Sequence, residues 1–209
     1  IFGLGPIGQM SGRIALHRGA RVIGIDRVPE RLELARKRGI EVINTDEVDD
    51  APAAVRELTD GRGPDSVIEA VGMEAHGSPV ISALQKAAKL LPDPLERKFM
   101  RTAGMDSLAA LYDCIDTVRR GGTLSIVGVY GGNADPLPMM TLFDKQVNIR
   151  MGQANVRRWT DQILPLLMDG DPLGVDDFAS HHVSLEEAPD AYDAFQKKTH
   201  GAFKILFKP

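Results

Sequence analysis

Ile1–Gly8 combines an apolar pair with three glycines in the spacing G-x-G-x-x-G. This pattern is typical of a buried strand, a tight turn and a helix that begins at Pro6. Gly3 permits the turn, Gly5 lets the backbone approach a pyrophosphate, and Gly8 lets the helix pack closely on the strand. The free N–H groups at the start of such a helix attract phosphates. A tight turn without a ligand is the alternative interpretation of the motif alone.

An acidic residue follows at the distance that a dinucleotide site requires. Arg21–Ile25 is a short β-branched run, and Asp26 stands directly after it, 18 positions beyond Gly8. In dinucleotide-binding folds an acid about 20 residues after the glycines binds the ribose hydroxyls. The alternative is a helix N-cap, because Pro29-Glu30 is typical of a first helical turn. One carboxylate can serve either role, and the turn, strand and acid together favour the dinucleotide.

The charge of Asp26 also bears on which dinucleotide binds. A carboxylate beside the ribose 2′-hydroxyl repels the 2′-phosphate of NADP, so the sequence favours NAD. Arg27 and Arg31 argue in the other direction, because guanidinium groups near that site pair well with phosphate. Their alternative is ordinary solvated charge at the entry of a helix. Asp26, Arg27 and Arg31 are therefore candidate cofactor-binding residues.

Strand-like and helix-like segments alternate as far as residue 152. The six expected strands lie at residues 1–2, 21–25, 41–43, 66–72, 124–128 and 147–151. This alternation predicts the α/β class, as a Rossmann doubly wound parallel sheet of about six strands with helices on both faces. Residues 73–106 interrupt the pattern and are expected to be an insertion. A Gly/Pro-rich loop is expected between the last two strands.

Residues 153–209 follow a different pattern. Trp159, Ile163, Leu166 and Leu167 form one apolar helical stripe, and Ser184–Glu187 has the signature of a capping box before a second helix. Residues 202–207 read as a final strand with no place in a six-stranded sheet. The pattern of this tail therefore differs from the strand–helix alternation that precedes it.

Composition excludes several classes of function. The chain has 209 residues and a formal net charge of −4, which gives no basic footprint for nucleic acid. No apolar run approaches the roughly 20 residues of a membrane span, and a single Cys114 excludes an internal disulfide. We see no signal peptide, which fits the cytoplasm. The chain opens in mid-strand without Met, so we expect it to be a fragment.

Four stretches carry a resemblance to a known family. They are Phe2–Gly8, Val67–Gly72, Gly121–Gly128 and Ala202–Pro209, and together they span almost the whole chain. They resemble the C-terminal half of medium-chain, zinc-dependent alcohol dehydrogenases. The segment Val71–Gly77 looks most like the glutathione-independent formaldehyde dehydrogenase subgroup, which carries an insertion at this place.

The resemblance implies two domains and a set of cofactor contacts. Residues 1–152 would form the NAD-binding domain, and residues 153–209 would return to complete a GroES-like catalytic domain. The implied contacts are the backbone of Pro6 and Ile7 at the pyrophosphate, Asp26 and Arg31 at the adenosine ribose, Val71, Val127 and Val129 beside the nicotinamide, and Lys204 near the phosphates.

The family's metal site is the largest departure from this resemblance. Its catalytic zinc is bound by Cys, His and an acidic residue in an N-terminal domain that is absent here. We therefore expect zinc in the complete enzyme but none on this chain, and we assign it no catalytic residue. Cys114 is expected to be a packed small side chain, and His181-His182, adjacent in an expected polar loop, make a poor chelate.

For the complete enzyme the resemblance implies hydride transfer between NAD and a small alcohol or aldehyde, with zinc as the Lewis acid. A homo-oligomer is expected, with neither nucleic acid nor membrane as a partner. One alternative is a zinc-free quinone reductase of the same superfamily. Such enzymes usually prefer NADPH, and Asp26 argues against that preference. The other is a non-catalytic NAD-sensing module of a transporter or repressor. Upstream Cys, His and acidic ligands would separate these classes.

Overall fold

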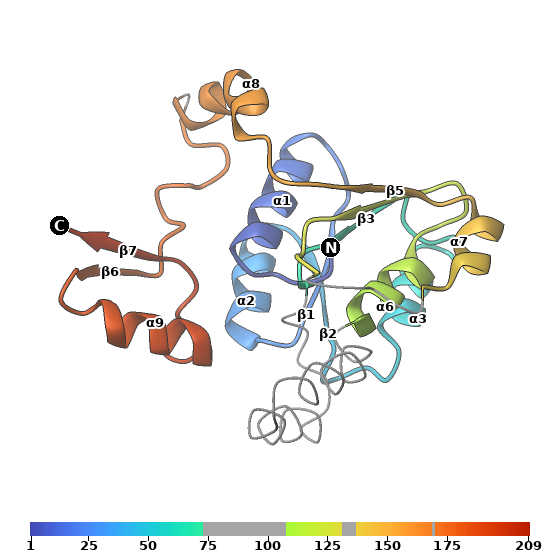
Figure 1. The fold of residues 1–209 in the computed structure, drawn as a ribbon, viewed down its shortest axis with the longest axis horizontal. Coiled ribbons are helices and arrows are strands. Elements are labelled where there is room, and N and C mark those ends of the chain that lie inside the picture. Colours follow the sequence, from blue (N-terminus) through green and yellow to red (C-terminus); the bar gives the residue numbers. More distant parts are fainter. Residues whose placement is uncertain (73–107, 131–136, 169) are drawn as a thin grey trace, which may run out of the picture. The chain divides into compact units, whose positions relative to one another are not determined.

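The computed structural model describes residues 1–72, 108–130, 137–168 and 170–209, so the insertion expected at residues 73–106 lies outside the described chain. Strands and helices alternate as predicted (Figure 1). The elements up to residue 151 are α1 (Pro6–His17), β1 (Ile23–Asp26), α2 (Pro29–Lys37), β2 (Glu41–Asn44), α3 (Ala51–Glu57), β3 (Ser66–Glu69), α6 (Ala109–Thr117), β4 (Thr123–Ile126), α7 (Met139–Lys145) and β5 (Asn148–Met151). The elements after it are α8 (Val156–Met168), β6 (His181–Ser184), α9 (Ala188–Lys197) and β7 (Ile205–Lys208).

The chain divides into two compact units. The first unit contains Ile1–Gly3 and Thr45–Gln153, and the second contains Leu4–Asn44 and Ala154–Pro209. The first holds a parallel sheet in the order β3-β4-β5, and the second holds the parallel pairs β1-β2 and β6-β7. Parallel pairing throughout confirms the predicted α/β class. The division into domains at residues 152 and 153 stays a prediction.

In the first unit, helices α3 and α6 cover buried strands. Val67 of β3 and Leu124 of β4 are register partners and are 2 % and 0 % exposed. Ile115 of α6 and Val55 of α3 complete this core at 2 % and 1 %. Such fully buried β-branched and leucine side chains are what a parallel strand between helix layers requires.

The expected first strand is reduced to a single bridge in the first unit. The N–H of Phe2 donates to Ile68 at 2.9 Å, and the N–H of Ala70 donates to Phe2 at 2.9 Å. This is the parallel pairing that a first strand beside β3 would make, but it extends over one residue. A continuous six-stranded sheet is not confirmed among the described residues.

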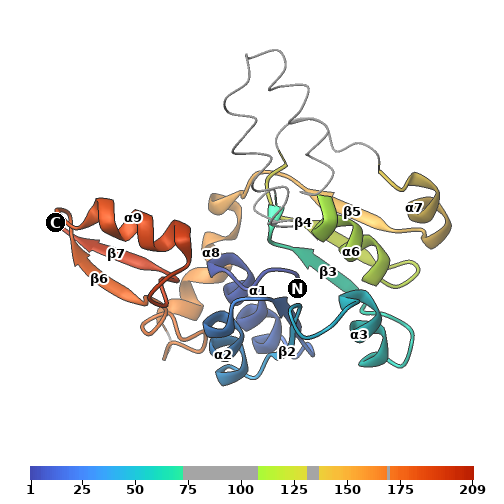
Figure 2. The same ribbon diagram turned by 90° about the horizontal axis from the view of Figure 1, so that it is seen from below.

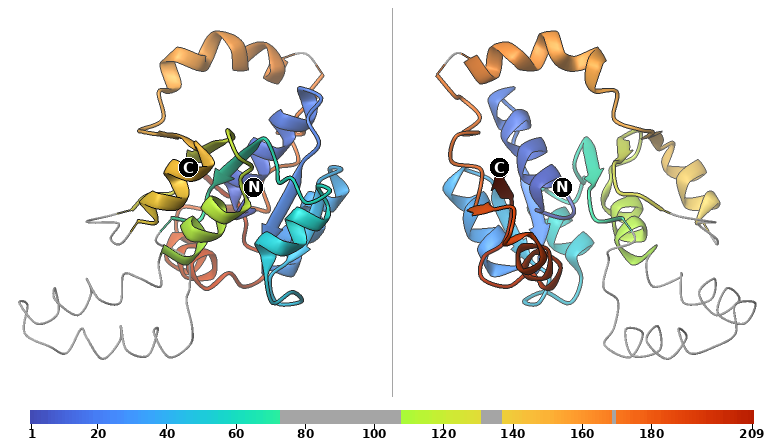
Figure 3. Two further views of the ribbon diagram at one scale, coloured as in Figure 1. Left: turned by 90° about the vertical axis from the view of Figure 1, so that its right-hand side faces the viewer. Right: turned by 60° about the vertical axis from the view of Figure 1, so that its left-hand side comes forward.

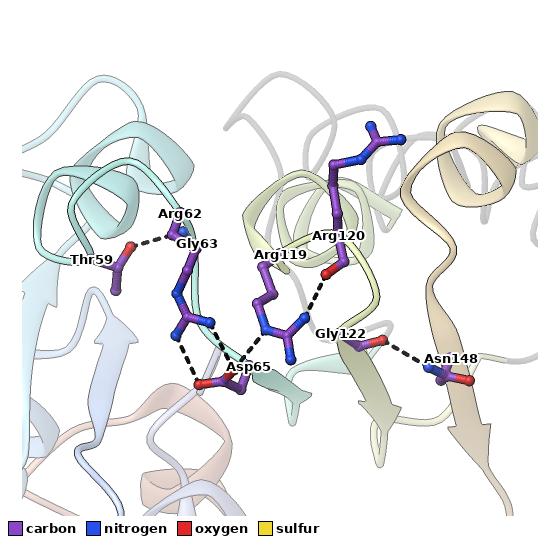
Figure 4. A network of polar contacts seen from close by, with 8 residues as sticks. All are labelled: Thr59, Arg62, Gly63, Asp65, Arg119, Arg120, Gly122 and Asn148. Atoms are coloured by element: carbon purple, nitrogen blue, oxygen red, sulfur yellow. Dashed lines mark hydrogen bonds and ion pairs between the residues drawn. The ribbon is translucent and has the colours of Figure 1, made fainter.

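An ion network holds the amino ends of the strands in the first unit. Figure 4 shows Arg62 and Arg119 both directed at Asp65, which directly precedes β3. The guanidinium nitrogens lie 2.6–3.0 Å from the carboxylate oxygens. These hydrogen bonds hold the pKa of Asp65 well below its ordinary value. The network fixes the start of β3 against the turn that follows α6.

In the second unit, α2 packs on the β1-β2 pair. Ile25 and Ile43 are register partners, and Leu32 and Ala35 of α2 are 1 % and 0 % exposed. Leu4, directly after the first glycine of the motif, is also fully buried. The turn is therefore anchored by an apolar side chain within its own unit.

A buried arginine fastens the tail to α1 in the second unit. Arg13 is 4 % exposed, and its Nη1 donates to the carbonyls of Leu173 at 3.1 Å and Gly174 at 2.7 Å. Its guanidinium also lies 4.8 Å from the ring centre of Phe178, within range of a cation–π contact. The sequence did not predict this attachment, since Arg13 stands in an ordinary helix pattern.

The tail confirms the predicted helices and strand and adds one strand. Helix α8 passes through Pro165 as one continuous helix, drawn in orange at the top of both views of Figure 3, and it has no buried residue. The final strand β7 pairs with β6, and α9 lies along one face of this pair (Figure 2). The interpretation of His181-His182 as a loop is therefore wrong, because both residues belong to β6.

Two expectations about single elements, the loop before β5 and the capping box before α9, differ from the structure. The loop expected between the last two strands contains α7 in its described part. The capping box at Ser184 forms in half, since Glu187 accepts a hydrogen bond from the Ser184 N–H at 2.9 Å while α9 begins at Ala188. Among the helices of the described ranges, none is long and apolar enough to span a membrane.

Candidate functional site

The glycine turn leaves the start of α1 open to an anion. Gly5 is the N-cap with φ −65° and ψ −174°, and no side chain caps the helix. Pro6 is the first helical residue and the first turn contains no acid, so the N–H groups of Ile7 and Gly8 lack intrahelical acceptors. Ile7 is 57 % exposed in spite of its apolar side chain. The positive end of α1 can therefore receive a phosphate.

Asp26 holds the turn from the end of β1. Its Oδ2 accepts a hydrogen bond from the N–H of Leu4 at 2.7 Å, and its Oδ1 accepts from the N–H groups of Arg27 at 2.7 Å and Val28 at 2.9 Å. The N-cap of α2 is Val28, so the interpretation of Asp26 as that cap is wrong. The carboxylate has about four acceptor positions and uses three of them here. It both fixes the turn and keeps capacity for one further donor.

Arg31 lies over the same turn. Its Nη1 is 3.8 Å from Asp26 Oδ2 and 3.8 Å from the place where a Cβ on Gly5 would stand. Gln9 supports Arg31 from α1, since its Nε2 donates to the Arg31 carbonyl at 2.7 Å while its Oε1 is buried without a partner. The second unit therefore brings Gly5, Asp26 and Arg31 together, and their binding of a cofactor stays a prediction. Nothing in the sequence pattern singled out Gln9.

The remaining basic candidates are exposed. Arg27 directly follows β1, and Lys204 directly precedes β7. The backbone N–H of Lys204 donates to Ser180 Oγ at 3.1 Å, which places this residue in the β6-β7 part of the second unit. Contact of either side chain with a cofactor phosphate stays a prediction.

The other candidates belong to the first unit, at the carboxyl ends of β3 and β4. Gly3 adopts φ +86°, and a Cβ there would lie 2.9 Å from Val71 Cγ2. Val71 therefore packs against the first glycine of the motif. Val127 and Val129 are 41 % and 77 % exposed. Exposed valines at this edge of a parallel sheet lie where ligands bind in open α/β folds.

A buried acidic residue, Glu69, lies at the carboxyl end of β3 in the first unit. Glu69, the last residue of β3, is 0 % exposed, and its Oε1 accepts hydrogen bonds from the N–H groups of Val71 and Gly72, each at 2.7 Å. Its Oε2 and the hydroxyl of Tyr130 are buried without hydrogen-bond partners. Burial and the negative charge of Glu69 raise the pKa of Tyr130, so the phenol stays neutral. Sequence reasoning missed Glu69, because an acid inside an apolar strand has no spacing signal.

The described residues do not fit a metal centre. No group of three His, Cys, Asp or Glu side chains in these ranges could hold a metal ion. Cys114 is fully buried, and burial together with the charge of Glu69 raises the pKa of its thiol, which opposes the thiolate that zinc requires. His182 is exposed, and His181 Nδ1 lies 2.9 Å from Ser180 Oγ. The absence of zinc from the whole chain stays a prediction.

Comparisons with known proteins relate this chain to alcohol dehydrogenases. Residues 6–91 match the family model described as zinc-binding dehydrogenase. The zinc-type alcohol dehydrogenase-like protein AdhB of Bacillus subtilis is 33 % identical over 211 residues, covering 100 % of this chain and 52 % of the relative. This chain is similar to zinc-type alcohol dehydrogenases. These matches support the medium-chain alcohol dehydrogenase superfamily, as the resemblance implied.

Two further similar proteins define the extent of the likeness. The structure of alcohol dehydrogenase TADH from Thermus sp. ATN1 superposes with a TM-score of 0.73 at 32 % identity, over 100 % of this chain and 50 % of that chain. Formaldehyde dismutase of Pseudomonas putida is 26 % identical over 98 % of this chain and 50 % of the relative. The formaldehyde dehydrogenase-like subgroup is not confirmed. The chain spans about half the length of the curated relatives it matches.

Proposed function

We propose that this chain is the NAD-binding part of a zinc-dependent alcohol or aldehyde dehydrogenase, which transfers hydride between NAD and a small alcohol. The observation that carries the proposal is the arrangement of Asp26 and Arg31 around the glycine turn, at a helix end without a cap. The likeness to alcohol dehydrogenases over the whole chain supports it.

Each group of candidate residues has a role in this proposal. The N–H groups of Ile7 and Gly8 bind the pyrophosphate, helped by the positive end of α1. The remaining acceptor position of Asp26 binds a ribose hydroxyl, and its negative charge excludes a 2′-phosphate. Val71, Val127 and Val129 line the nicotinamide and exclude water from it. Bound NAD supplies the hydride acceptor.

The described residues do not supply the zinc site, so we derive no metal-assisted step from them. Cys, His and acidic ligands, if found elsewhere in the full-length protein, would distinguish this proposal from a zinc-free quinone reductase and from an NAD-sensing module. A cytoplasmic location and a homo-oligomer are also part of the proposal, and light scattering of the purified protein tests the second.

Cofactor titration tests the proposal at Asp26. In the full-length protein we expect NADH to bind about tenfold or more tightly than NADPH, because the carboxylate repels the 2′-phosphate. Asp26→Asn removes the charge and keeps one acceptor oxygen, which can serve the Leu4 N–H but not also the N–H groups of Arg27 and Val28. It should narrow this preference to within about threefold.

Asp49→Asn is the matched control, because Asp49 is an exposed acid before α3. It should leave the preference unchanged. Equal affinity of the wild-type protein for both cofactors, measured by calorimetry, contradicts the proposal.

A further inference from the structure

We propose that Glu69 is a positioning residue, whose buried carboxylate fixes the backbone of Val71 and Gly72 and thereby the surface against which the nicotinamide end of the cofactor lies. This inference rests on the proposed function. Glu69 itself touches no cofactor, since it is wholly buried at the end of β3.

The carboxylate closes the turn that follows β3. One oxygen receives two backbone N–H donors, from Val71 and Gly72, each at 2.7 Å. Hydrogen bonds to an ionised acceptor are about twice as strong as neutral ones, so this turn has little freedom. Val71 is then held with its Cγ2 against Gly3, at the first glycine of the motif.

The same turn is locked against the end of β4. Gly72 has φ +63°, and a Cβ on it would stand 2.7 Å from the nitrogen of Val129. A Cβ on Gly128 would collide with Glu69 Oε2 and with the Gly72 nitrogen. Val127 and Gly128 also donate their N–H groups to the Glu69 carbonyl, at 2.9 and 3.1 Å. The Glu69 carboxylate therefore fixes the turn that carries Val71, and this turn and the Glu69 carbonyl contact the end of β4, which carries Val127 and Val129.

Burying the Glu69 carboxylate costs desolvation free energy, which suggests a role for it beyond folding. Oε2 of Glu69 is buried and makes no hydrogen bond within 3.5 Å, although Tyr130 is near enough for the carboxylate to raise the pKa of its phenol. A buried carboxylate with one oxygen outside hydrogen-bond distance of a donor is costly to desolvate, so its presence calls for an explanation. A neutral side chain would close the same turn at a smaller desolvation cost. A rigid turn at the cofactor edge explains why a carboxylate is present.

Two ligands separate positioning from a merely structural role. NADH engages the nicotinamide edge, whereas ADP-ribose has the same adenosine and pyrophosphate but no nicotinamide. In the full-length protein, Glu69→Ala should raise the NADH Kd about tenfold or more and leave the ADP-ribose Kd within about twofold. Glu69→Gln retains one carbonyl acceptor and should weaken NADH by about threefold. It also tests the inference if the alanine variant does not fold.

Glu41→Gln is the matched control, because Glu41 is an exposed strand acid paired with Arg21 at 2.6 Å. It should change neither Kd. Equal weakening of NADH and ADP-ribose by the Glu69 variants overturns the inference, as does unchanged NADH affinity in both. A wild-type protein that binds neither ligand contradicts the proposed function and the inference with it.

Discussion

Gly3 and Gly19 share nearly the same backbone conformation but have different surroundings. Their φ values are +86° and +80°. A Cβ on Gly3 would lie 2.9 Å from Val71 Cγ2 and 3.0 Å from the Ala70 oxygen, whereas nothing lies within 4 Å of one on Gly19. Gly3 therefore serves two purposes, a left-handed turn and a close approach, and Gly19 serves only the first.

This difference predicts the effect of adding one methyl group. Gly3→Ala should lower the free energy of unfolding by about 2–4 kcal/mol, through backbone strain plus overpacking. Gly19→Ala should cost about 1 kcal/mol from strain alone. Urea denaturation of both variants measures the difference. Equal losses would show that Val71 moves away from Gly3 without cost.

Local signals predicted part of the site, and contacts between distant residues make up the rest. The glycine spacing and the acid after β1 singled out Gly5 and Asp26 as candidates for one site, because a strand–turn–helix unit places such residues at the same end of the sheet. Gln9, Arg13 and Glu69 gave no such signal. Arg13 meets its acceptors 160 and 161 residues along the chain, a pairing that no periodicity encodes.

At the scale of elements, Arg13 holds the segment before β6 onto α1. Its Nη2 and Nε are buried without hydrogen-bond partners, so the attachment depends on its two bonds to Leu173 and Gly174 and on its contact with the Phe178 ring. Arg13→Met fills a similar volume but leaves both carbonyls without their donor. We expect a loss of about 2–4 kcal/mol in the stability of this attachment.

Hydrogen exchange of residues 171–178 measures that loss directly. The N–H of Val175 in this segment donates a hydrogen bond to Asp171 Oδ1 at 2.6 Å. In Arg13→Met this N–H should exchange about 30 to 1,000 times faster, which corresponds to the expected loss of stability. Arg18→Met is the control, because Arg18 is exposed at the end of the same helix. Unchanged exchange in Arg13→Met would contradict the role of this attachment.

Elements with a strong local pattern were predicted, and two short elements were not. Helices α1, α2 and α6 have apolar residues at helical spacing and clear ends. Helix α7 has only seven residues inside a Gly/Pro-rich region. Strand β6 reads His-His-Val-Ser and is stabilised by its parallel pairing with β7, from which it is separated by α9. Partner-dependent strands of this kind leave no trace in single-sequence patterns.

At the scale of the whole molecule, α8 exposes its apolar residues to solvent. Trp159 is 42 % exposed and Leu167 is 44 %, with Met168 at 73 %. Exposed apolar stripes on a helix mark contact surfaces. The prediction that the tail completes a catalytic domain assigns this surface to the remainder of the protein.

Tryptophan fluorescence tests that assignment, since Trp159 is the single tryptophan of this chain. In the isolated chain its emission should be quenched readily by acrylamide. In the full-length protein, with any other tryptophan replaced by Phe, quenching should fall about threefold or more because α8 is covered. Urea-unfolded samples of both serve as the control and should quench alike. Equal quenching of the two native forms would contradict the assignment.

Redesign of the cofactor preference meets a mechanical conflict at Asp26. The carboxylate expected to repel a 2′-phosphate is also the acceptor for the N–H of Leu4, and this hydrogen bond stabilises the glycine turn. Replacing Asp26 by glycine to allow NADP to bind would also remove the hydrogen bond that stabilises the turn. In the proposed function, the cofactor preference and the rigidity of the glycine turn therefore depend on the same side chain. A directed-evolution library that seeks one without the other has to keep an acceptor for the Leu4 N–H, as Asp26→Asn does, when it gives up the charge.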